Sequence, residues 1–552
     1  MPQKAKEREF RLSVCLVYPN TQKVGASYLG FHKIYSALSE VCDCDTAFLP
    51  EGGGKLRSQN QNRELGSFDL LAFSLTFETD ILNVLEILKR AGVPLEREER
   101  DDDQPLVCAG GIAPTLNPEP FADFFDFMVI GEGELTLREW VEKLAESGGK
   151  RRMERLESLA GTAGVYVPSL YEEELAETGR IISRKTLGSG PAVVKRLYDV
   201  SFAKKGSAQV MDMETVFGDS WLLETGKGCG QGCRFCAAGF IYRPTRHVDL
   251  ERLVEQISDG LARKKRIGLI GSAICEHPDI KKVYAEILRQ GGGINVSSLR
   301  IGYVDSEMLR QLVRGGLHTM TIAPEAGTER LRRSVNKNVA DAEILGTVGE
   351  AVTAGMRNVK MYFLVGLPGE EDGDVTAIVT LVKKLRDEFV KKSKPLGRAG
   401  KITVAVNPFV PKPQTPFQWE PFAAQKDLKR KMAEVKKGLS REANVELKLE
   451  SGKGAAVQAL MSLGNRTAGR GAVRAFTDGD WKNALREAGL ASASLAGRDK
   501  NEILPWDFID SGVTKEYLWN ERERAFAGKV TPPCPPGLSG CERCGKFLGN
   551  CC

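Results

Sequence analysis

Short apolar runs alternate with amphipathic segments through the first 150 residues of the chain. Apolar runs of four to eight residues are typical of buried strands, and the segments between them have apolar residues at helical spacing. Strands that are apolar on both faces predict a parallel sheet covered by helices on both sides. We therefore expect an α/β fold that starts with a doubly wound, flavodoxin-like domain at 1–150, with any ligand at the carboxyl ends of its strands. The expected strands are 11–19, 44–50, 68–75, 105–111 and 125–134, and the expected helices are 28–41, 81–92 and 137–146.

A second series of strand–helix units begins at Ser220. Six units predict a partial (β/α)6 barrel at 216–423, with its active site at the carboxyl ends of the strands. Residues 151–215 are expected to form a linker with a small hairpin, 424–530 a mostly helical region, and 531–552 a Cys-rich tail. The expected barrel strands are 220–226, 266–272, 294–301, 317–324, 358–368 and 401–409, and the helices are 249–263, 278–290, 305–314, 340–354 and 373–390.

Composition adds limits to this picture. Hydrophobic residues make up 42% of the chain and charged residues 27%, which is typical of a globular protein. No stretch approaches the about 20 apolar residues that span a bilayer, and the N-terminal apolar run fits a strand better than a signal peptide. We expect a cytoplasmic protein without membrane contact, whose thiols stay reduced. The net charge of +5 neither demands nor excludes a polyanionic partner.

Three of the 13 cysteines, Cys229, Cys233 and Cys236, lie in the glycine-rich segment ETGKGCGQGCRFCAAGF at 224–240. Structural zinc needs a fourth ligand, and the next ten residues contain neither Cys nor His. A [4Fe–4S] cluster has four irons, so three thiolates leave one iron without a protein ligand. An open position of this kind distinguishes a catalytic metal site from a structural one. The segment therefore predicts a catalytic [4Fe–4S] site after the first barrel strand.

This arrangement, Cys-x-x-x-Cys-x-x-Cys with Phe235 before the last cysteine, resembles the radical SAM superfamily. The resemblance implies that S-adenosylmethionine (SAM) chelates the fourth iron, that an external flavodoxin- or ferredoxin-type donor reduces the cluster, and that SAM cleavage yields a 5′-deoxyadenosyl radical. It also suggests positions that bind SAM, although each could instead be an ordinary turn or solvated strand end. The usual acidic residue is missing after the second strand. The candidates are Phe235, Gly271, Ser272, Ser298, Arg300, Glu325 and Gly366.

The N-terminal segments FSLTFE (73–78), CAGGIAP (108–114) and VIGEGE (129–134) resemble those of vitamin-B12-binding domains that precede radical SAM barrels. The Asp-x-His-x-x-Gly segment that gives histidine to cobalt in that group is absent. Either cobalamin binds without a protein imidazole, or the domain is a scaffold. A resemblance to methylthiotransferases is weaker, because the N-terminal cysteines lie mainly inside strands. Over most of its length the chain resembles an uncharacterised subgroup of these proteins, and this resemblance identifies no substrate.

Two features follow the barrel. Cys534, Cys541, Cys544 and Cys551 could hold an auxiliary Fe–S cluster or zinc, or could belong to a flexible or redox-active tail. Several basic residues could bind RNA through its phosphates, or form solvated helix faces. They are Lys426, Lys429, Arg430, Lys431, Lys436, Lys437, Arg441, Arg466, Arg470 and Arg474.

The sequence thus favours a radical SAM enzyme that begins its reaction by abstracting hydrogen from a C–H bond, with catalytic residues and substrate unidentified. A cobalamin-dependent methyltransferase is the alternative within this class. RNA or small-molecule modification without cobalamin is the other route that we consider. A non-catalytic Fe–S sensor or scaffold is the alternative outside the class.

Overall fold

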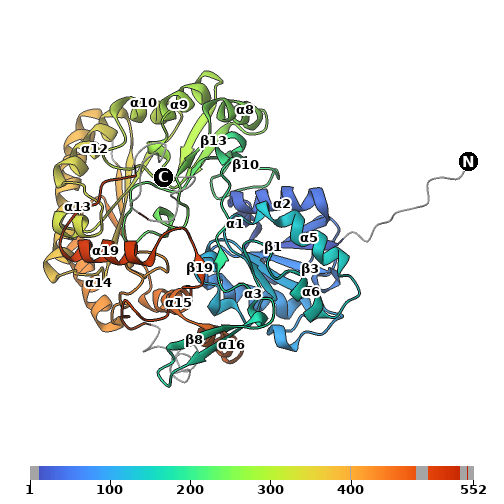
Figure 1. Cartoon of the computed structure of the whole chain (residues 1–552). Helices are drawn as coiled ribbons and strands as arrows, with labels where there is room; N and C mark the ends of the chain where they lie inside the picture. Colours follow the sequence, from blue (N-terminus) through green and yellow to red (C-terminus); the bar gives the residue numbers. More distant parts are fainter. Residues whose placement is uncertain (1–11, 398–399, 480–494, 535–543, 545–552) are drawn as a thin grey trace, which may run out of the picture.

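The computed structural model describes residues 12–397, 400–479, 495–534 and 544. Figure 1 shows an N-terminal α/β lobe beside a larger lobe in which helices surround a curved set of strands. No helix within the described ranges has the length and apolar character that a bilayer span requires.

The N-terminal lobe is built on one sheet with the strand order β2-β1-β3-β4-β5-β6. Strands β1 to β5 run parallel, and β6 pairs antiparallel with β5. Helices α2 and α5 pack together. Helix α3 packs against α16, so the C-terminal part of the chain also covers this lobe. The α/β fold class is confirmed. The elements are β1 Ser13–Tyr18, α1 Gln22–Gly25, α2 Leu29–Val41, β2 Asp43–Phe48, β3 Leu70–Ser74, α3 Ile81–Ala91, β4 Leu106–Gly110, α4 Ile112–Leu116, β5 Phe127–Val129, α5 Leu137–Glu146, α6 Arg152–Ser158 and β6 Val165–Tyr166.

The region predicted as a linker is more closely joined to the lobe than its composition suggests. Helix α6 is held by Arg152, whose guanidinium forms a 2.6 Å ion pair with buried Asp126. The expected hairpin is present as β7 (Tyr171–Leu175) and β8 (Ile181–Thr186). Strand β9 pairs with β19 from near the chain's end, so the region joins distant parts of the sequence. The remaining elements are β9 Val194–Lys195, α7 Phe202–Lys205, β10 Ser207–Ala208 and β19 Ile509–Asp510.

The larger lobe has two sheets whose main strands are all parallel: β11-β13-β14, and β15-β16-β17-β18. A hydrogen bond of 2.8 Å from the Leu299 amide to the Thr321 carbonyl oxygen joins them where β14 and β15 do not pair. Strand β14 is shorter than the predicted 294–301, so Ser298 and Arg300 lie in the loop after it. The elements are β11 Ser220–Lys227, β12 Arg246–His247, α8 Leu250–Leu261, β13 Arg266–Gly271, α9 Ile280–Arg289, β14 Gly293–Val296, α10 Ser306–Arg314, β15 Thr319–Glu325, α11 Glu329–Ser334, α12 Asp341–Ala354, β16 Asn358–Val365, α13 Asp372–Ser393 and β17 Lys401–Pro408.

The region after residue 423 is not only helical. Helix α14 leads into β18, which adds a further parallel strand beside β17. The sequence VELKL of β18 is short and polar, because the strand lies at the sheet edge and stays partly exposed, so it lacks the apolar pattern of the other strands. The elements are α14 Gln425–Leu439, β18 Val445–Leu449, α15 Gly452–Leu463, α16 Arg466–Asp478 and α19 Lys515–Phe526.

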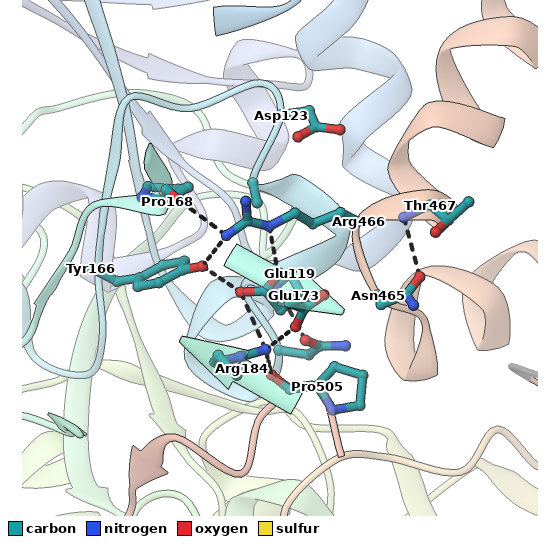
Figure 2. A network of polar contacts seen from close by, with 12 residues as sticks. Glu119, Asp123, Tyr166, Pro168, Glu173, Arg184, Asn465, Arg466, Thr467 and Pro505 are labelled. Atoms are coloured by element: carbon teal, nitrogen blue, oxygen red, sulfur yellow. Dashed lines mark hydrogen bonds and ion pairs between the residues drawn. The ribbon is translucent and has the colours of Figure 1, made fainter. Parts of the chain in front are cut away.

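A buried polar network attaches α16 to the N-terminal lobe (Figure 2). The Arg466 guanidinium donates to Glu119 and to the Tyr166 hydroxyl, both at 2.9 Å, and Tyr166 in turn donates to Glu119. From hairpin strand β8, Arg184 pairs with Glu173. The network therefore joins three segments that are far apart in the sequence.

The proposed basic surface is interrupted by these contacts. Arg466 pairs with Glu119, Arg470 with Asp123 at 2.8 Å, and buried Lys431 with Glu370 at 3.0 Å. Arg430 bonds Asp372 and Asp427. Arg466 and Lys431 are therefore largely buried in their ion pairs, whereas Arg430 and Arg470 stay exposed beside carboxylates that interrupt the basic face.

Candidate active site

The three-cysteine loop leaves the carboxyl end of β11, on the side of the larger lobe where its parallel strands end, which we call the barrel mouth. Gly228 and Gly232 have φ angles of +80° and +65°, which L side chains rarely adopt. A Cβ at Gly228 would also lie only 2.6 Å from the Tyr242 carbonyl oxygen. The glycines therefore permit the tight path that brings the cysteines to the barrel mouth.

The loop is anchored on both sides by buried side chains. Arg234, which is fully buried, donates to the carbonyl oxygens of Ser334 and Lys529 at 2.7 Å, and pairs with Glu521 at 3.1 Å. Asn336 donates to the carbonyl oxygens of Gln231 and Gly232 at 3.0 and 3.2 Å. These contacts fix the loop backbone in place before any ligand binds.

The three thiols need a positive charge beside them to act as ligands. Burial, the nearby Glu276 carboxylate and the neighbouring cysteines raise the pKa of Cys229 to about 12, and burial together with Cys233 raises the pKa of Cys236 to about 11. A bound metal supplies the positive charge that would hold such thiols as thiolates. In the described part of the chain, no three Cys, His, Asp or Glu side chains gather around one ion position. A cubane places its thiolates on different irons, so it does not need such close convergence.

Beside the loop lies an open cavity of about 530 Å³ at the ends of β13, β14 and β15. Gly271 and Ser272, which follow β13, line it together with Ser298 and Arg300. Four of the seven positions that the sequence suggested for SAM therefore share one cavity. Lys337 and Ala323 also line it.

Arg300 connects this cavity to the cysteines. Its Nη1 lies 4.0 Å from the Cys233 Sγ, and its Nη2 donates to the Gln231 Oε1 at 3.0 Å. Gln231 in turn donates to Glu276 at 2.9 Å and to the Tyr303 hydroxyl at 2.6 Å. These four side chains, Gln231, Glu276, Arg300 and Tyr303, form what we call the mouth network.

The mouth network has buried polar atoms that lack hydrogen bonds. Within the described residues, the Glu276 Oε1 and the Arg300 Nε make no hydrogen bond; they lie 3.6 Å apart, an ion-pair distance that is too long for a hydrogen bond. Burial raises the pKa of Glu276 above its ordinary value. Unsatisfied buried polar groups are costly in a folded protein, so a polar ligand in the adjoining cavity would satisfy them.

Sequence reasoning missed Glu276. The acidic residue that the resemblance led us to expect directly after the second strand is absent, but Glu276 ends a short 3-10 turn, Ile274–Glu276, that returns it to the mouth. The only signal in the sequence was a carboxylate five positions after Gly271. That spacing does not by itself predict that the side chain turns back to the barrel mouth.

The other suggested residues lie around the cavity or away from it. Glu325 has a φ of +70° and pairs at 2.9 Å with Lys337, which lines the cavity. Phe235 packs against an apolar cluster at the strand ends that includes Phe409 and Phe417. Gly366 is not among the described residues that line this cavity; it has a φ of +85°, and a Cβ there would lie 2.9 Å from the Ala423 Cβ. Its contact with SAM stays a prediction.

A larger cavity, of about 950 Å³, lies at the carboxyl edge of the N-terminal sheet. Helices α2 and α5 flank it, and Gly110 and Gly111, from the segment CAGGIAP, line it. The lining also includes Lys227 and Tyr242, which flank the cysteine loop. The buried indole Nε1 of Trp140, another lining residue, has no hydrogen-bond partner in the described part of the chain. The cavity thus reaches from the sheet to the barrel mouth.

Ion pairs join the two lobes beside this cavity. Glu132 binds Arg246 at 2.6 Å and Lys227 at 3.5 Å, and Glu134 lies 3.8 Å from the Lys227 ammonium. Among the described residues, no histidine lines this cavity. Both ring nitrogens of His32 are engaged, by the Ala26 carbonyl oxygen and by backbone amides at 210–211.

The C-terminal tail returns to the cysteine loop. The Cys534 amide donates to the Gly230 carbonyl oxygen at 2.8 Å, and Cys544 is buried nearby. Cys541 and Cys551 lie outside the described residues.

Comparison with known proteins identifies two matching regions. A family model described as "Radical SAM proteins, N-terminal" matches residues 30–168, and one described as "Radical SAM superfamily" matches 223–382. An uncharacterized protein of Methanocaldococcus jannaschii is 28% identical over 82% of this chain and 89% of its own. A putative methylthiotransferase of the same organism is 22% identical over 59% of this chain and 68% of its own.

More distant similarities extend this set. An uncharacterized methyltransferase of Pyrococcus horikoshii is 22% identical over 52% of this chain and 59% of its own. Among solved structures, the cobalamin-dependent SAM radical enzyme OxsB matches with a TM-score of 0.45 and 16% identity, over 67% of this chain and 52% of OxsB.

Proposed function

The chain belongs to the radical SAM superfamily and is an enzyme of that class, which uses a [4Fe–4S] cluster and SAM, and from this premise we propose that it binds SAM in the 530 Å³ cavity and acts on a substrate in the barrel lumen. The observation that carries the proposal is the position of Arg300, which lies between this cavity and Cys233. A sensor without catalysis is set aside, because the family consists of enzymes.

When bound, the cluster and SAM together supply reductive cleavage of the sulfonium and a carbon-centred radical. Cys229, Cys233 and Cys236 would hold the cluster. The Arg300 guanidinium is suited to bind a carboxylate, and the Glu276 carboxylate is suited to bind an ammonium group, which are the two charges of the SAM amino-acid moiety. Ser272 and Ser298 offer hydroxyls to the remaining polar atoms.

The barrel lumen has room for polar substrate contacts. On β15 and β16, residues alternate between buried and half-buried, and Ala323 on the half-buried side lines the SAM cavity. Lys360 and Tyr362 lie on the corresponding side of β16, with the Lys360 ammonium 4.8 Å from the centre of the Tyr362 ring. The partly exposed inner face, rather than a packed one, supports substrate binding there.

The test is the reductive cleavage of SAM by the full chain. After anaerobic reconstitution, incubation with SAM and dithionite should release 5′-deoxyadenosine, measured by chromatography and mass spectrometry. Cys233→Ala should lower the rate at least about 100-fold, because the cluster loses a ligand. Cys44→Ser, a half-buried thiol on β2, is the matched control and should retain activity. Wild-type protein that holds iron and releases no 5′-deoxyadenosine would contradict the proposal.

A second candidate function is cobalamin-dependent methylation, favoured by the 950 Å³ cavity and its unpartnered Trp140 indole. A Cβ at Gly110 would have only the Val129 carbonyl oxygen nearby, at 3.8 Å, so this glycine leaves room for a flat ligand. The lining residues would contact a corrinoid directly. His32 would not supply an imidazole to the cobalt, because both of its ring nitrogens already make hydrogen bonds with the backbone. Hydroxocobalamin titration should show binding that Gly110→Val weakens about tenfold or more; no binding by the wild type would remove this candidate.

RNA as a substrate remains a proposal with less support. Arg466 and Lys431 are buried in ion pairs, and Arg430 and Arg470 pair with carboxylates at the surface, so fewer cations are available to contact phosphates. The family's chemistry also calls for an external protein that donates an electron to the cluster. In the test above, dithionite takes the place of this donor.

A further inference from the structure

The second sheet of the larger lobe ends in an open edge at β18. Strand β18 bonds to β17 through its even-numbered residues, as the 3.2 Å bond from the Glu450 amide to the Val406 carbonyl oxygen shows. In a parallel pair, the main-chain groups of alternate residues point to opposite sides of the strand. The outward residues of β18 are Val445, Leu447 and Leu449.

The outward main-chain groups are available to a further strand. Within the described part of the chain, the amides and carbonyl oxygens of Leu447 and Leu449 make no hydrogen bond. The Leu449 side chain is also 37% exposed. An edge with unpaired N–H and C=O groups is a template for another strand unless its side chains repel that strand. The side-chain pattern of β18 therefore decides whether a strand can bind.

The two faces of β18 differ in character. Val445 and Leu447 pack against the apolar core of the larger lobe, and α14 lies against the strand. Glu446 and Lys448 lie on the opposite face, with side chains that are 39% and 61% exposed. Lys401 of the neighbouring strand pairs with Glu446 at 2.5 Å and orients its carboxylate. One face is thus apolar, and the other carries one charge of each sign.

A second copy of β18 matches both faces when it runs antiparallel about a two-fold axis at Leu447. Glu446 then lies opposite Lys448 of the second copy, and the symmetry repeats this pair. These are non-hydrogen-bonded positions, where opposite side chains are closest. On the apolar face, Val445 lies opposite Leu449 of the second copy, so the exposed leucine is covered. The strand is therefore complementary to itself, as a two-fold interface requires.

The ends of the strand favour this axis over its neighbours. Asn444, directly before β18, has a φ of +64°, and α15 begins at Gly452. An axis at Val445 or Leu449 would pair strand residues with these non-extended segments. Only the axis at Leu447 pairs every residue of β18 with another residue of the strand.

We propose that the β18 edge binds a second copy of this chain and forms a two-fold dimer in which the two sheets are continuous. A five-residue edge is small beside the about 1,600 Å² of a standard interface, so we expect a dimer that dissociates on dilution. The surface uses none of the residues assigned to the cluster or to SAM. Failure of the dimer would therefore leave the proposed enzymatic function standing.

The experiment measures self-association of the full-length protein. Sedimentation velocity over about a hundredfold range of concentration should show a reversible monomer–dimer equilibrium. Glu446→Lys places lysines opposite each other at both charged positions and should raise the Kd about tenfold or more. Glu446→Lys combined with Lys448→Glu keeps opposite charges facing and should restore the Kd to within about threefold of the wild type. Glu142→Lys, on the exposed face of α5, is the matched control and should leave the Kd unchanged.

Leu449→Pro provides an independent variant. It removes an outward amide but no hydrogen bond to β17, because proline is tolerated where the N–H of an edge strand faces solvent. This variant should be monomeric at every concentration tested, and circular dichroism checks that each variant is folded. A dimer that Glu446→Lys weakens and the charge swap restores supports the proposal. A wild type that stays monomeric, a dimer that survives Glu446→Lys or Leu449→Pro, or a swap that fails to restore the dimer overturns it.

Discussion

Two buried polar networks in this molecule contain the same kinds of side chain and differ in what surrounds them. Around Glu119, each charged group has an ion-pair partner: Arg466 is 2.9 Å from Glu119, and Arg184 pairs with Glu173. Within the described part of the chain, the Arg184 Nε and Nη1 make no hydrogen bond, but the guanidinium lies 4.0 Å from the Phe508 ring centre. In the mouth network, Arg300 and Glu276 are 3.6 Å apart, without a hydrogen bond, beside an open cavity.

The comparison shows that the burial of a charged side chain does not by itself indicate whether that side chain stabilises the fold or binds a ligand. The ion pairs of the Glu119 network join the N-terminal lobe, the β7–β8 hairpin and α16 (Figure 2). Loss of these ion pairs should therefore lower the stability of the fold. The mouth network leaves polar atoms available to a ligand, so its loss should affect SAM binding. Substitutions in the two networks should therefore have opposite signatures.

The largest effect is expected for Arg466→Met. Removal of one partner leaves Glu119 buried and without its closest cation, which should lower the free energy of unfolding by about 3–5 kcal/mol. Urea denaturation followed by circular dichroism measures this change, and the KM for SAM of the protein that remains folded should be unchanged. An altered KM with wild-type stability would reverse the assigned roles.

The next effect is expected for Arg300→Gln. Loss of a charge-assisted contact should lower kcat/KM for SAM about 10- to 100-fold, which corresponds to about 1.4–2.7 kcal/mol. Single-turnover assays of 5′-deoxyadenosine formation over a range of SAM concentrations measure it. The free energy of unfolding should change by less than about 1 kcal/mol, because the 3.6 Å pair with Glu276 adds little stability. A large stability loss without a kinetic effect would make the mouth network structural.

A smaller effect is expected for Glu276→Gln. The amide keeps the shape and the hydrogen bond with Gln231 but loses the charge, so the KM for SAM should rise about 3- to 10-fold, or about 1 kcal/mol. Equilibrium binding of SAM to the reconstituted protein provides the measurement. Tyr303→Phe, in the same network without a charge change, is the control and should alter binding less.

The smallest effect concerns pH and the Glu119 network. Burial and the neighbouring Glu119 carboxylate raise the pKa of Glu173 to about 7, so the folded state takes up a proton that the unfolded chain holds only below about pH 4.5. The stability from this group is full below pH 4.5 and falls as pH rises towards 7, because the unfolded chain loses the proton of Glu173 at a lower pH than the folded state does. Unfolding curves at pH 5 and 7.5 should show the fall, and Glu173→Gln should remove it.

The sequence predicted features that depend on local pattern. The strand–helix series and the loop of Cys229, Cys233 and Cys236 follow from periodicity and spacing, and Gly271, Ser272, Ser298 and Arg300 meet because parallel strands end at one edge. Contacts between distant segments have no such signal. The pairing of Arg466 with Glu119, the return of Glu276 to the mouth, and the packing of Cys534 on Gly230 all depend on tertiary structure, and β18 was missed because an edge strand need not be apolar.

The anchor of Arg234 has a consequence for biosynthesis. Its partner Glu521 is 287 positions later in the chain, which a ribosome adding about 5–20 residues per second reaches about 15–60 s after Arg234. Until then, Glu521 of α19 cannot stabilise the segment that carries the three thiols. Iron delivery to this protein should consequently follow release of a nearly complete polypeptide, and nascent chains stalled before α19 should load iron poorly.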